Sequence, residues 1–161
     1  MSLGSAGADS GVLSLRAVVQ RVSRASVRVG PEETGRIPRG LVVLVGVARD
    51  DTPQDARRLA EKIAHLRVFP EGDKEFHLSP LEAGAEVLAV SQFTLLADTG
   101  KGRRPSFDGA APADEARPLY EEFLQALSSW GLKVETGRFQ EHMTVEIYND
   151  GPVTLLLSTR E

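Results

Sequence analysis

The chain has 161 residues, a net charge of −4 at pH 7 and no cysteine. This length is typical of a single domain. The negative net charge argues against a protein that coats nucleic acid non-specifically. The missing cysteine excludes disulfides, thiolate metal ligands and a cysteine nucleophile, and no apolar run approaches the roughly 18 residues of a membrane-spanning helix.

The first residues, 1–14, are rich in Gly, Ser and Ala. They lack the basic segment and the long apolar segment of a signal peptide. We therefore predict a disordered extension over 1–14, followed by a single domain over 15–161.

The first third of this domain is predicted to be mainly strand. Arg16 to Val29 is rich in β-branched residues, and its apolar alternation changes phase near Ser23-Arg24, which indicates a bulge or a change of face. Gly30 to Gly40 is a turn region around a short strand at 34–37. Leu41 to Ala48 is continuously apolar, which predicts a strand buried on both faces.

Two helices are predicted. The first begins at Thr52-Pro53, which provide an N-cap and a proline at the first helical position. The second runs from Ala113 to Trp130 and ends before Gly131. The expected buried stripes are Ala56, Leu59, Ile63 and Leu66 in the first helix, and Leu119, Phe123, Leu127 and Trp130 in the second.

The remaining segments complete an α+β domain of six to eight strands and two helices. A long strand is expected from Glu86 to Leu96, and the region from Pro70 to Gly84 is expected to be irregular. Shorter strands are predicted at Arg67 to Phe69, Phe76 to Leu78, Lys133 to Thr136, Met143 to Tyr148 and Val153 to Ser158.

The familiar catalytic motifs are missing. His65, His77 and His142 lie far apart and lack the spacing of paired metal ligands, so no metal site is expected. Ser91 lacks the flanking glycines of a hydrolase nucleophile elbow. A glycine-rich dinucleotide motif between strand and helix is also missing.

Three stretches of the sequence remain unexplained. Ser91-Gln92-Phe93-Thr94 places polar side chains on a strand expected to be central, which indicates either internal hydrogen bonds or a polar pocket. Lys101, Arg103 and Arg104 form either a solvated loop or a phosphate contact. The segment from Asn149 to Thr154 is an ordinary hairpin turn, or a place where Gly151 permits close approach of the backbone.

These stretches, read as SQFTL, KGRRPSF and NDGPVT, closely resemble the D-aminoacyl-tRNA deacylases. The runs GLVVLVGVA and ETGRF resemble that family in the same order, over residues 15–158. The resemblance implies a three-layer β/β/α fold, cytoplasmic location, and proofreading hydrolysis of the ester that joins a D-amino acid to the 3′-terminal adenosine of tRNA. It also implies rejection of L-aminoacyl groups, no cofactor, and a homodimer with the active site at its interface.

The family's functional residues map onto particular positions of this chain. The catalytic pocket would be Ser91, Gln92, Phe93 and Thr94, with Gly151, Pro152 and Asn149 reaching it from the partner subunit and Lys101, Arg103 and Arg104 contacting tRNA. We expect a cis Gly151-Pro152 bond that acts as a chirality gate. Thr94 is expected to position the substrate, while backbone N–H groups near it stabilise the oxyanion.

Three alternatives remain open at this point. The chain could be a small-molecule esterase or amidase on the same scaffold, or a nucleic-acid-binding module without catalysis. Glycine mischarged on tRNA could also be a substrate, since it has no side chain to exclude.

Overall fold

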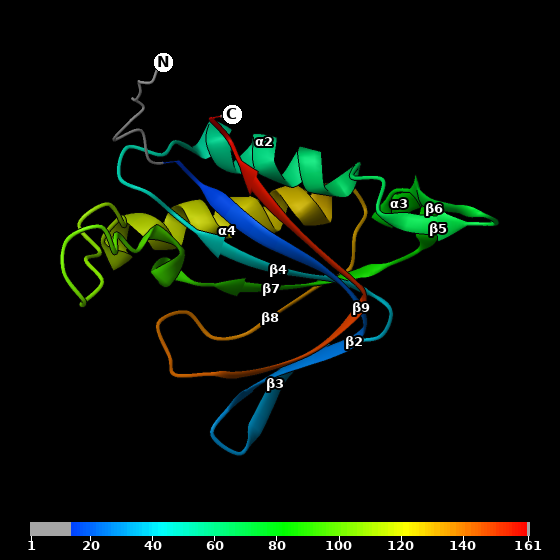
Figure 1. Cartoon of the computed structure of the whole chain (residues 1–161), viewed down its shortest axis with the longest axis horizontal. Helices are drawn as coiled ribbons and strands as arrows, with labels where there is room; N and C mark the ends of the chain where they lie inside the picture. Colours follow the sequence, from blue (N-terminus) through cyan, green and yellow to red (C-terminus); the bar gives the residue numbers. More distant parts are fainter. Residues whose placement is uncertain (1–13, 161) are drawn as a thin grey trace.

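The computed structural model describes residues 14–160 and shows an α+β domain, as predicted (Figure 1). The predicted disorder of the N-terminal extension lies outside the described residues, except at Ser14. Ser14 is buried, and its hydroxyl hydrogen-bonds the Ser158 hydroxyl. The ordered domain therefore includes Ser14, one residue earlier than predicted.

The longest connection between the strands and helices runs from η1 to α4, over residues 97–112. The strands are β2 (Arg16–Val29), β3 (Glu32–Ile37), β4 (Gly40–Gly46), β5 (Phe69–Glu71), β6 (Lys74–Leu78), β7 (Glu86–Ser91), β8 (Val134–Thr136) and β9 (Thr144–Ser158). The helices are α2 (Pro53–Ala64), α3 (Pro80–Ala83), α4 (Ala113–Ser129) and a short 3₁₀ helix, η1 (Phe93–Leu96).

Strand β2 organises the main sheet. Strand β9 pairs antiparallel with it along one edge, while β4 and then β3 pair with successive halves of its other edge. Strands β7 and β8 extend the sheet in parallel from β4. The β2–β9 register shifts between Val22 and Arg24, where the sequence predicted a bulge, and β2 passes there from β4 to β3.

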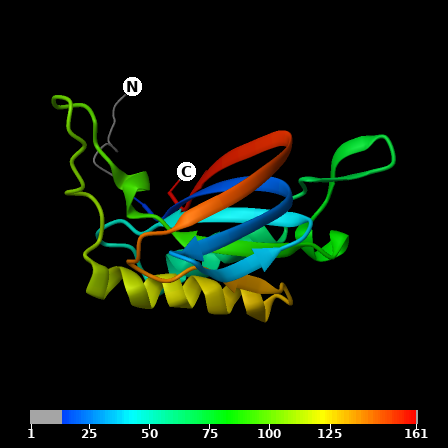
Figure 2. The same ribbon diagram turned by 90° about the horizontal axis from the view of Figure 1, so that it is seen from below.

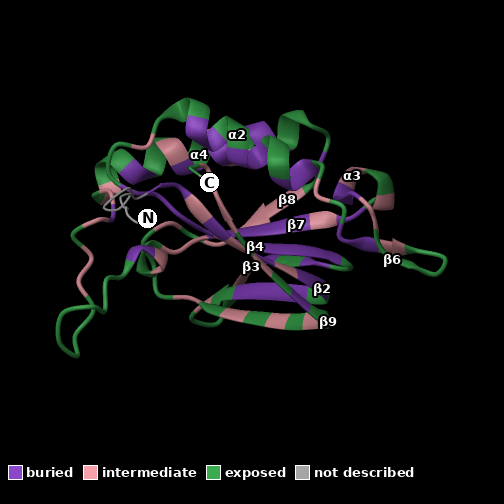
Figure 3. Ribbon diagram, turned by 45° about the horizontal axis from the view of Figure 1, so that its top comes forward, coloured by how far each residue is buried: buried purple, intermediate pink, exposed green. Residues whose placement is uncertain are grey.

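Two cores lie on opposite faces of β4 and β7. On one face, Val43 packs with Ile63 of α2 and Phe123 of α4. On the other, Val42 and Leu88 pack beneath the strands β2, β3 and β9, which arch over them. Figure 2 shows α4 on one side of the sheet and the arch of β2 and β9 on the other, and Figure 3 shows the buried strands between these layers. The predicted three-layer β/β/α arrangement is therefore confirmed.

The predicted strand from Glu86 to Leu96 is too long. Strand β7 ends at Ser91, and Phe93 to Leu96 form η1. Gly46 permits this turn, because a Cβ on Gly46 would lie 2.5 Å from Leu96 Cδ2 and 2.9 Å from the Gln92 carbonyl oxygen. The close approach of η1 to the end of β4 is a tertiary feature that strand periodicity cannot reveal.

The hairpin interpretation of Asn149 to Thr154 is wrong. The segments on both sides of it belong to one strand, β9, and both pair with β2 in the same antiparallel direction. The turn-forming residues create an irregularity within a continuous strand. The pairing with β2 thus overrides their local preference for a reversal.

The helices differ from prediction in three details. The last member of the α4 stripe, Trp130, lies beyond the helix end and is 40% exposed, with its ring edge-on to His65 at 4.6 Å. Leu119 is only partly buried, whereas its neighbour Tyr120 is buried. The short helix α3, with a capping box at Ser79, lies inside the region expected to be irregular.

Candidate active site

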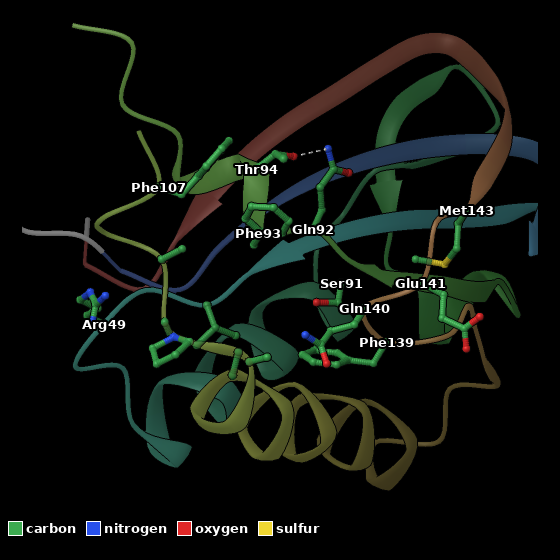
Figure 4. A pocket seen from close by; sticks show the side chains of 16 residues that line it. Arg49, Ser91, Gln92, Phe93, Thr94, Phe107, Phe139, Gln140, Glu141 and Met143 are labelled. Carbon is green, nitrogen blue, oxygen red and sulfur yellow. Dashed lines mark hydrogen bonds between the residues drawn. The ribbon is translucent and has the colours of Figure 1, made fainter. Parts of the chain in front are cut away.

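A cavity of about 530 Å³ lies where β7 passes into η1, beside the start of α4 (Figure 4). All four residues predicted to be catalytic, Ser91, Gln92, Phe93 and Thr94, line it. Other lining side chains include Arg49, Phe107, Phe139, Gln140, Glu141 and Met143. The structure therefore gathers the predicted residues around one concave surface.

The parallel pairing of β4 with β7 sets the position of the motif. Ser91 is the last residue of β7 and lies opposite Val45, whose carbonyl accepts a hydrogen bond of 2.8 Å from the Gln92 N–H. The chain then turns into η1, so the strand alternation predicted for Phe93 and Thr94 ends. All four side chains reach one cavity because they no longer alternate across a sheet.

The polar side chains of the motif also bond to each other. Gln92 Nε2 donates to Thr94 Oγ1 at 3.1 Å. With its oxygen accepting that bond, the Thr94 hydroxyl keeps its own hydrogen free to donate. Both interpretations of the motif therefore apply, since its side chains form an internal hydrogen bond and line a pocket.

Aromatic residues form much of the cavity wall. Phe93 is 56% exposed and lies edge-on to Phe107, with ring centroids 5.0 Å apart. Phe139 packs between the Tyr120 ring at 5.8 Å and the Arg117 guanidinium at 4.6 Å. Sequence analysis assigned no role to Phe107 and Phe139, although both occur in the quoted motifs KGRRPSF and ETGRF.

Tyr120 supports this wall from within the core. Its hydroxyl donates to the Ala89 carbonyl at 3.1 Å, and burial raises the pKa of Tyr120 well above its usual range. The side chain is therefore a neutral hydrogen-bond donor that ties α4 to β7. It fixes the aromatic wall without lining the cavity itself.

The predicted gate residues do not line this cavity. The Gly151-Pro152 peptide bond is cis, as predicted, and both residues are exposed. Asn149 holds the irregular segment, because its Oδ1 accepts from the Val153 N–H at 3.1 Å and its Nδ2 donates to Thr154 Oγ1 at 2.9 Å. Within one chain the two signature motifs therefore belong to separate surfaces.

A buried arginine anchors the Gly-Pro segment from below. Arg21 is 3% exposed; its Nε donates to the Asp150 carbonyl at 3.2 Å and its Nη1 to the Val68 carbonyl at 2.8 Å. Its Nη2 lies 2.6 Å from Glu75 Oε2. Sequence analysis missed Arg21, because it lies in an alternating strand where an arginine is expected to face solvent.

The predicted tRNA-contacting residues lie on an exposed loop. Asp98 and Ser106 exchange backbone hydrogen bonds of 2.7 and 2.9 Å, and the loop between them carries Lys101, Arg103 and Arg104. Lys101 lines a second hollow of about 800 Å³ beside the cavity, whereas the two arginines line neither hollow.

Residues 14–160 contain neither a cluster of metal ligands nor a membrane-spanning helix. No group of three or more His, Asp or Glu side chains there is arranged to hold a metal ion. No helix in the same range is long and apolar enough to cross a membrane.

The chain is similar to known proteins over most of its length. The family model described as D-Tyr-tRNA(Tyr) deacylase matches residues 18–158. A curated protein named D-aminoacyl-tRNA deacylase from Desulforudis audaxviator is 57% identical over 147 residues, covering 91% of this chain and 99% of its own. A protein of the same name from Thermotoga petrophila is 52% identical over 145 residues, covering 90% and 97%.

Solved structures share the fold. A protein named c-Myc DNA Unwinding Element Binding Protein superposes with a TM-score of 0.83 at 40% identity, covering 89% of this chain and 97% of its own. A structure described as "a probable eukaryotic D-amino acid tRNA deacylase" gives a TM-score of 0.79 at 19% identity, covering 90% and 99%. At that lower identity the second likeness concerns the fold alone.

Proposed function

The chain belongs to the D-Tyr-tRNA(Tyr) deacylase family, and we propose that its cavity at Ser91 to Thr94 is the place where it deacylates tRNA. It is a hydrolase that cleaves D-aminoacyl-tRNA into free D-amino acid and tRNA, a proofreading reaction of translation. The gathering of the SQFT residues around one cavity carries the assignment of the site. The alternative of a non-catalytic binding module is not favoured, because the close relatives are named as deacylases.

The cavity suits the hydrolysis of an ester that is already activated. Positioning the ester and a water molecule supplies much of the rate effect, so a strong nucleophile is not required. The first N–H groups of a helix lack intrahelical acceptors, and in η1 these belong to Phe93 and Thr94. We assign them to the developing oxyanion, and we assign the Thr94 hydroxyl to orienting the substrate without forming a covalent intermediate.

Chirality is assigned to the Gly-Pro segment of the partner subunit. A rigid backbone wall at the position of an L side chain rejects every L-amino acid, whatever the side chain of the matching D-amino acid. Gly151 has no Cβ and can approach the substrate closely. Arg21 and Asn149 keep the exposed segment in one conformation.

We propose a homodimer, because the proposed gate segment does not line the cavity of its own chain and must then come from a partner subunit. Light scattering at micromolar concentration is expected to give about twice the chain mass of 17.4 kDa. Dilution below the dissociation constant should remove deacylation together with the dimer. A monomer that retains full activity would contradict the shared site.

The RNA part of the substrate is assigned to a small basic region. An acidic enzyme can bind the end of a tRNA if a local cluster of cations meets the phosphates. Lys101, Arg103 and Arg104 form such a cluster on an exposed loop beside the cavity. We place the enzyme in the cytoplasm, where its substrate occurs, and include glycyl-tRNA among its substrates because glycine has no side chain for the gate to exclude.

The decisive experiment compares D-Tyr-tRNA with L-Tyr-tRNA. The purified protein is expected to release tyrosine rapidly from the D-ester and at no more than the spontaneous rate from the L-ester. A free D-tyrosine methyl ester serves as the control for a small-molecule esterase. Equal hydrolysis of the methyl ester and the tRNA ester would favour that alternative.

A further inference from the structure

The active-site cavity and the second hollow share one lining residue, Arg49. Arg49 lines both spaces, and Figure 4 shows it at the end of the cavity remote from Ser91 and Phe139. The second hollow, of about 800 Å³, is also lined by Arg16, Lys101 and Arg160. Four cationic side chains thus line the second hollow, on a protein whose net charge is −4.

Three of these cations form no ion pair with another residue of the range 14–160. None of the ion pairs within residues 14–160 involves Arg16, Arg49 or Lys101. Arg49 is held by a neutral group, since its Nε donates to the Asp108 backbone carbonyl at 2.5 Å. Arg16 Nε is buried without a hydrogen-bond partner in the described part of the chain.

The acidic residues around the hollow are arranged differently. Within residues 14–160, Arg160 is the one lining cation that is paired, with Asp51 at 3.5 Å and Asp55 at 3.4 Å. Asp50, Asp98 and Asp108 also line the hollow, and one oxygen of Asp98 already accepts the Gly100 N–H at 2.9 Å. These carboxylates weaken the local field but leave Arg16, Arg49 and Lys101 as cations without described ion pairs.

The charged residues of the cavity itself favour one orientation of the bound substrate. Among its described lining residues only Arg49 and Glu141 are charged, and Figure 4 shows them at opposite ends. An aminoacyl-tRNA end is likewise polar, with a cationic α-ammonium at the amino acid and anionic phosphates along the nucleotides. Phosphates are repelled at the Glu141 end and attracted at the Arg49 end.

Resting on the deacylation proposed above, we propose that the second hollow binds the sugar-phosphate backbone of the 3′ strand of tRNA. The ester lies at Ser91 to Thr94, Arg49 meets the phosphate at the junction, and Arg16 and Lys101 meet the phosphates that follow. Single-stranded nucleic acids are commonly bound by cations that follow the backbone, and Arg16, Arg49 and Lys101 would supply them here. These contacts depend on the phosphate charges and not on the bases, so the hollow binds the 3′ end of a tRNA whatever its sequence.

The test places a positive or a negative charge at one exposed, uncharged position of the hollow. Ala97 is exposed and lines it, so Ala97→Lys and Ala97→Glu add opposite charges on long side chains. KM for D-Tyr-tRNA is expected to fall about threefold with lysine and to rise about threefold with glutamate. Arg16→Gln should raise KM in the same direction as glutamate and reduce the slope of log KM against log salt by about 0.7.

A second substrate separates this inference from the function on which it rests. D-tyrosyl-adenosine carries the ester without the preceding nucleotides, so the KM ratio between the two substrates reports the contacts to the rest of the tRNA. Arg58→Gln, on the exposed face of α2, is the matched control and should leave this ratio unchanged. If the wild type cleaves neither D-ester, the deacylase assignment fails; if it cleaves both and the two Ala97 variants shift KM in the same direction or not at all, the phosphate path is wrong.

Discussion

Gly151→Ala is expected to lower kcat/KM for D-Tyr-tRNA by about a hundredfold, because a displacement of about 1 Å at a positioning element has an effect of that size. Gly151 has φ +125°, where an L residue with a Cβ is strained. An added Cβ would lie 2.8 Å from Val153 Cγ2 and 3.1 Å from Arg21 Nη2. The methyl group therefore collides with the support of the gate within its own chain, and the whole segment must move. Single-turnover deacylation of D- and L-Tyr-tRNA measures both the loss of activity and any gain of L cleavage.

Gly30→Ala provides the matched control for this substitution. Gly30 also has positive φ, +57°, but a Cβ there would meet nothing within 4 Å. Both variants carry backbone strain on the order of 1–2 kcal/mol, and only Gly151→Ala displaces the gate. Wild-type rates for the Gly151 variant, or an equal loss for both, would contradict the gate.

Arg21→Met is expected to lower the melting temperature by about 5–10 °C, which corresponds to a loss of about 2–3 kcal/mol for a chain of this size. The methionine fills much of the buried space but leaves the Val68 and Asp150 carbonyls without their donor. The Gly-Pro segment then loses its anchor, so deacylation of D-Tyr-tRNA should fall more steeply than stability alone explains. Calorimetry and deacylation below the transition temperature separate these two effects.

Two further variants define the role of Arg21. Arg21→Lys keeps the charge but cannot reach three acceptors with one planar group, and it should recover only part of the loss. Arg57→Gln removes an exposed ion pair with Glu122 at 3.2 Å and should change stability by less than about 1 kcal/mol. A stable, fully active Arg21→Met protein would show that the segment keeps its conformation without this anchor.

Local patterns predicted those elements whose burial is regular. The apolar run in β4 indicated a strand buried on both faces, and Val42 and Val43 are indeed fully buried on opposite sides. Thr52 was identified as the N-cap of α2, and its side chain accepts the Asp55 N–H at 3.2 Å. In both cases the decisive interactions lie within a few residues of each other or repeat with a fixed period.

The errors occurred where distant parts of the chain decide the conformation. Residues Asn149 to Thr154 have the composition of a reversal, yet pairing with β2 keeps β9 in one direction. The turn of η1 depends on the lack of a side chain at Gly46, about 50 residues earlier in the sequence. Arg21 gains its role from Val68 and Asp150, which no pattern within β2 could indicate.

The candidate site was predicted from composition only in outline. Absence of cysteine and of the known catalytic motifs narrowed the chemistry, but the resemblance of SQFTL and NDGPVT to a family supplied the roles. Phe107, Phe139 and Arg49 reach the cavity from separate segments. Their convergence is a property of the tertiary fold.

The pairing of β2 with β9 also determines when the protein can fold during its synthesis. Arg16 lies opposite Ser158, so β2 is held by a strand that is translated roughly 140 residues later. Contacts between positions so far apart in sequence form slowly. The edge of β2 that β9 covers must therefore stay unpaired until Thr144–Ser158 has been translated. The Gly-Pro segment lies in the same strand, so a nascent chain that already contains Ser91 to Thr94 still lacks the segment that we propose as the chirality gate.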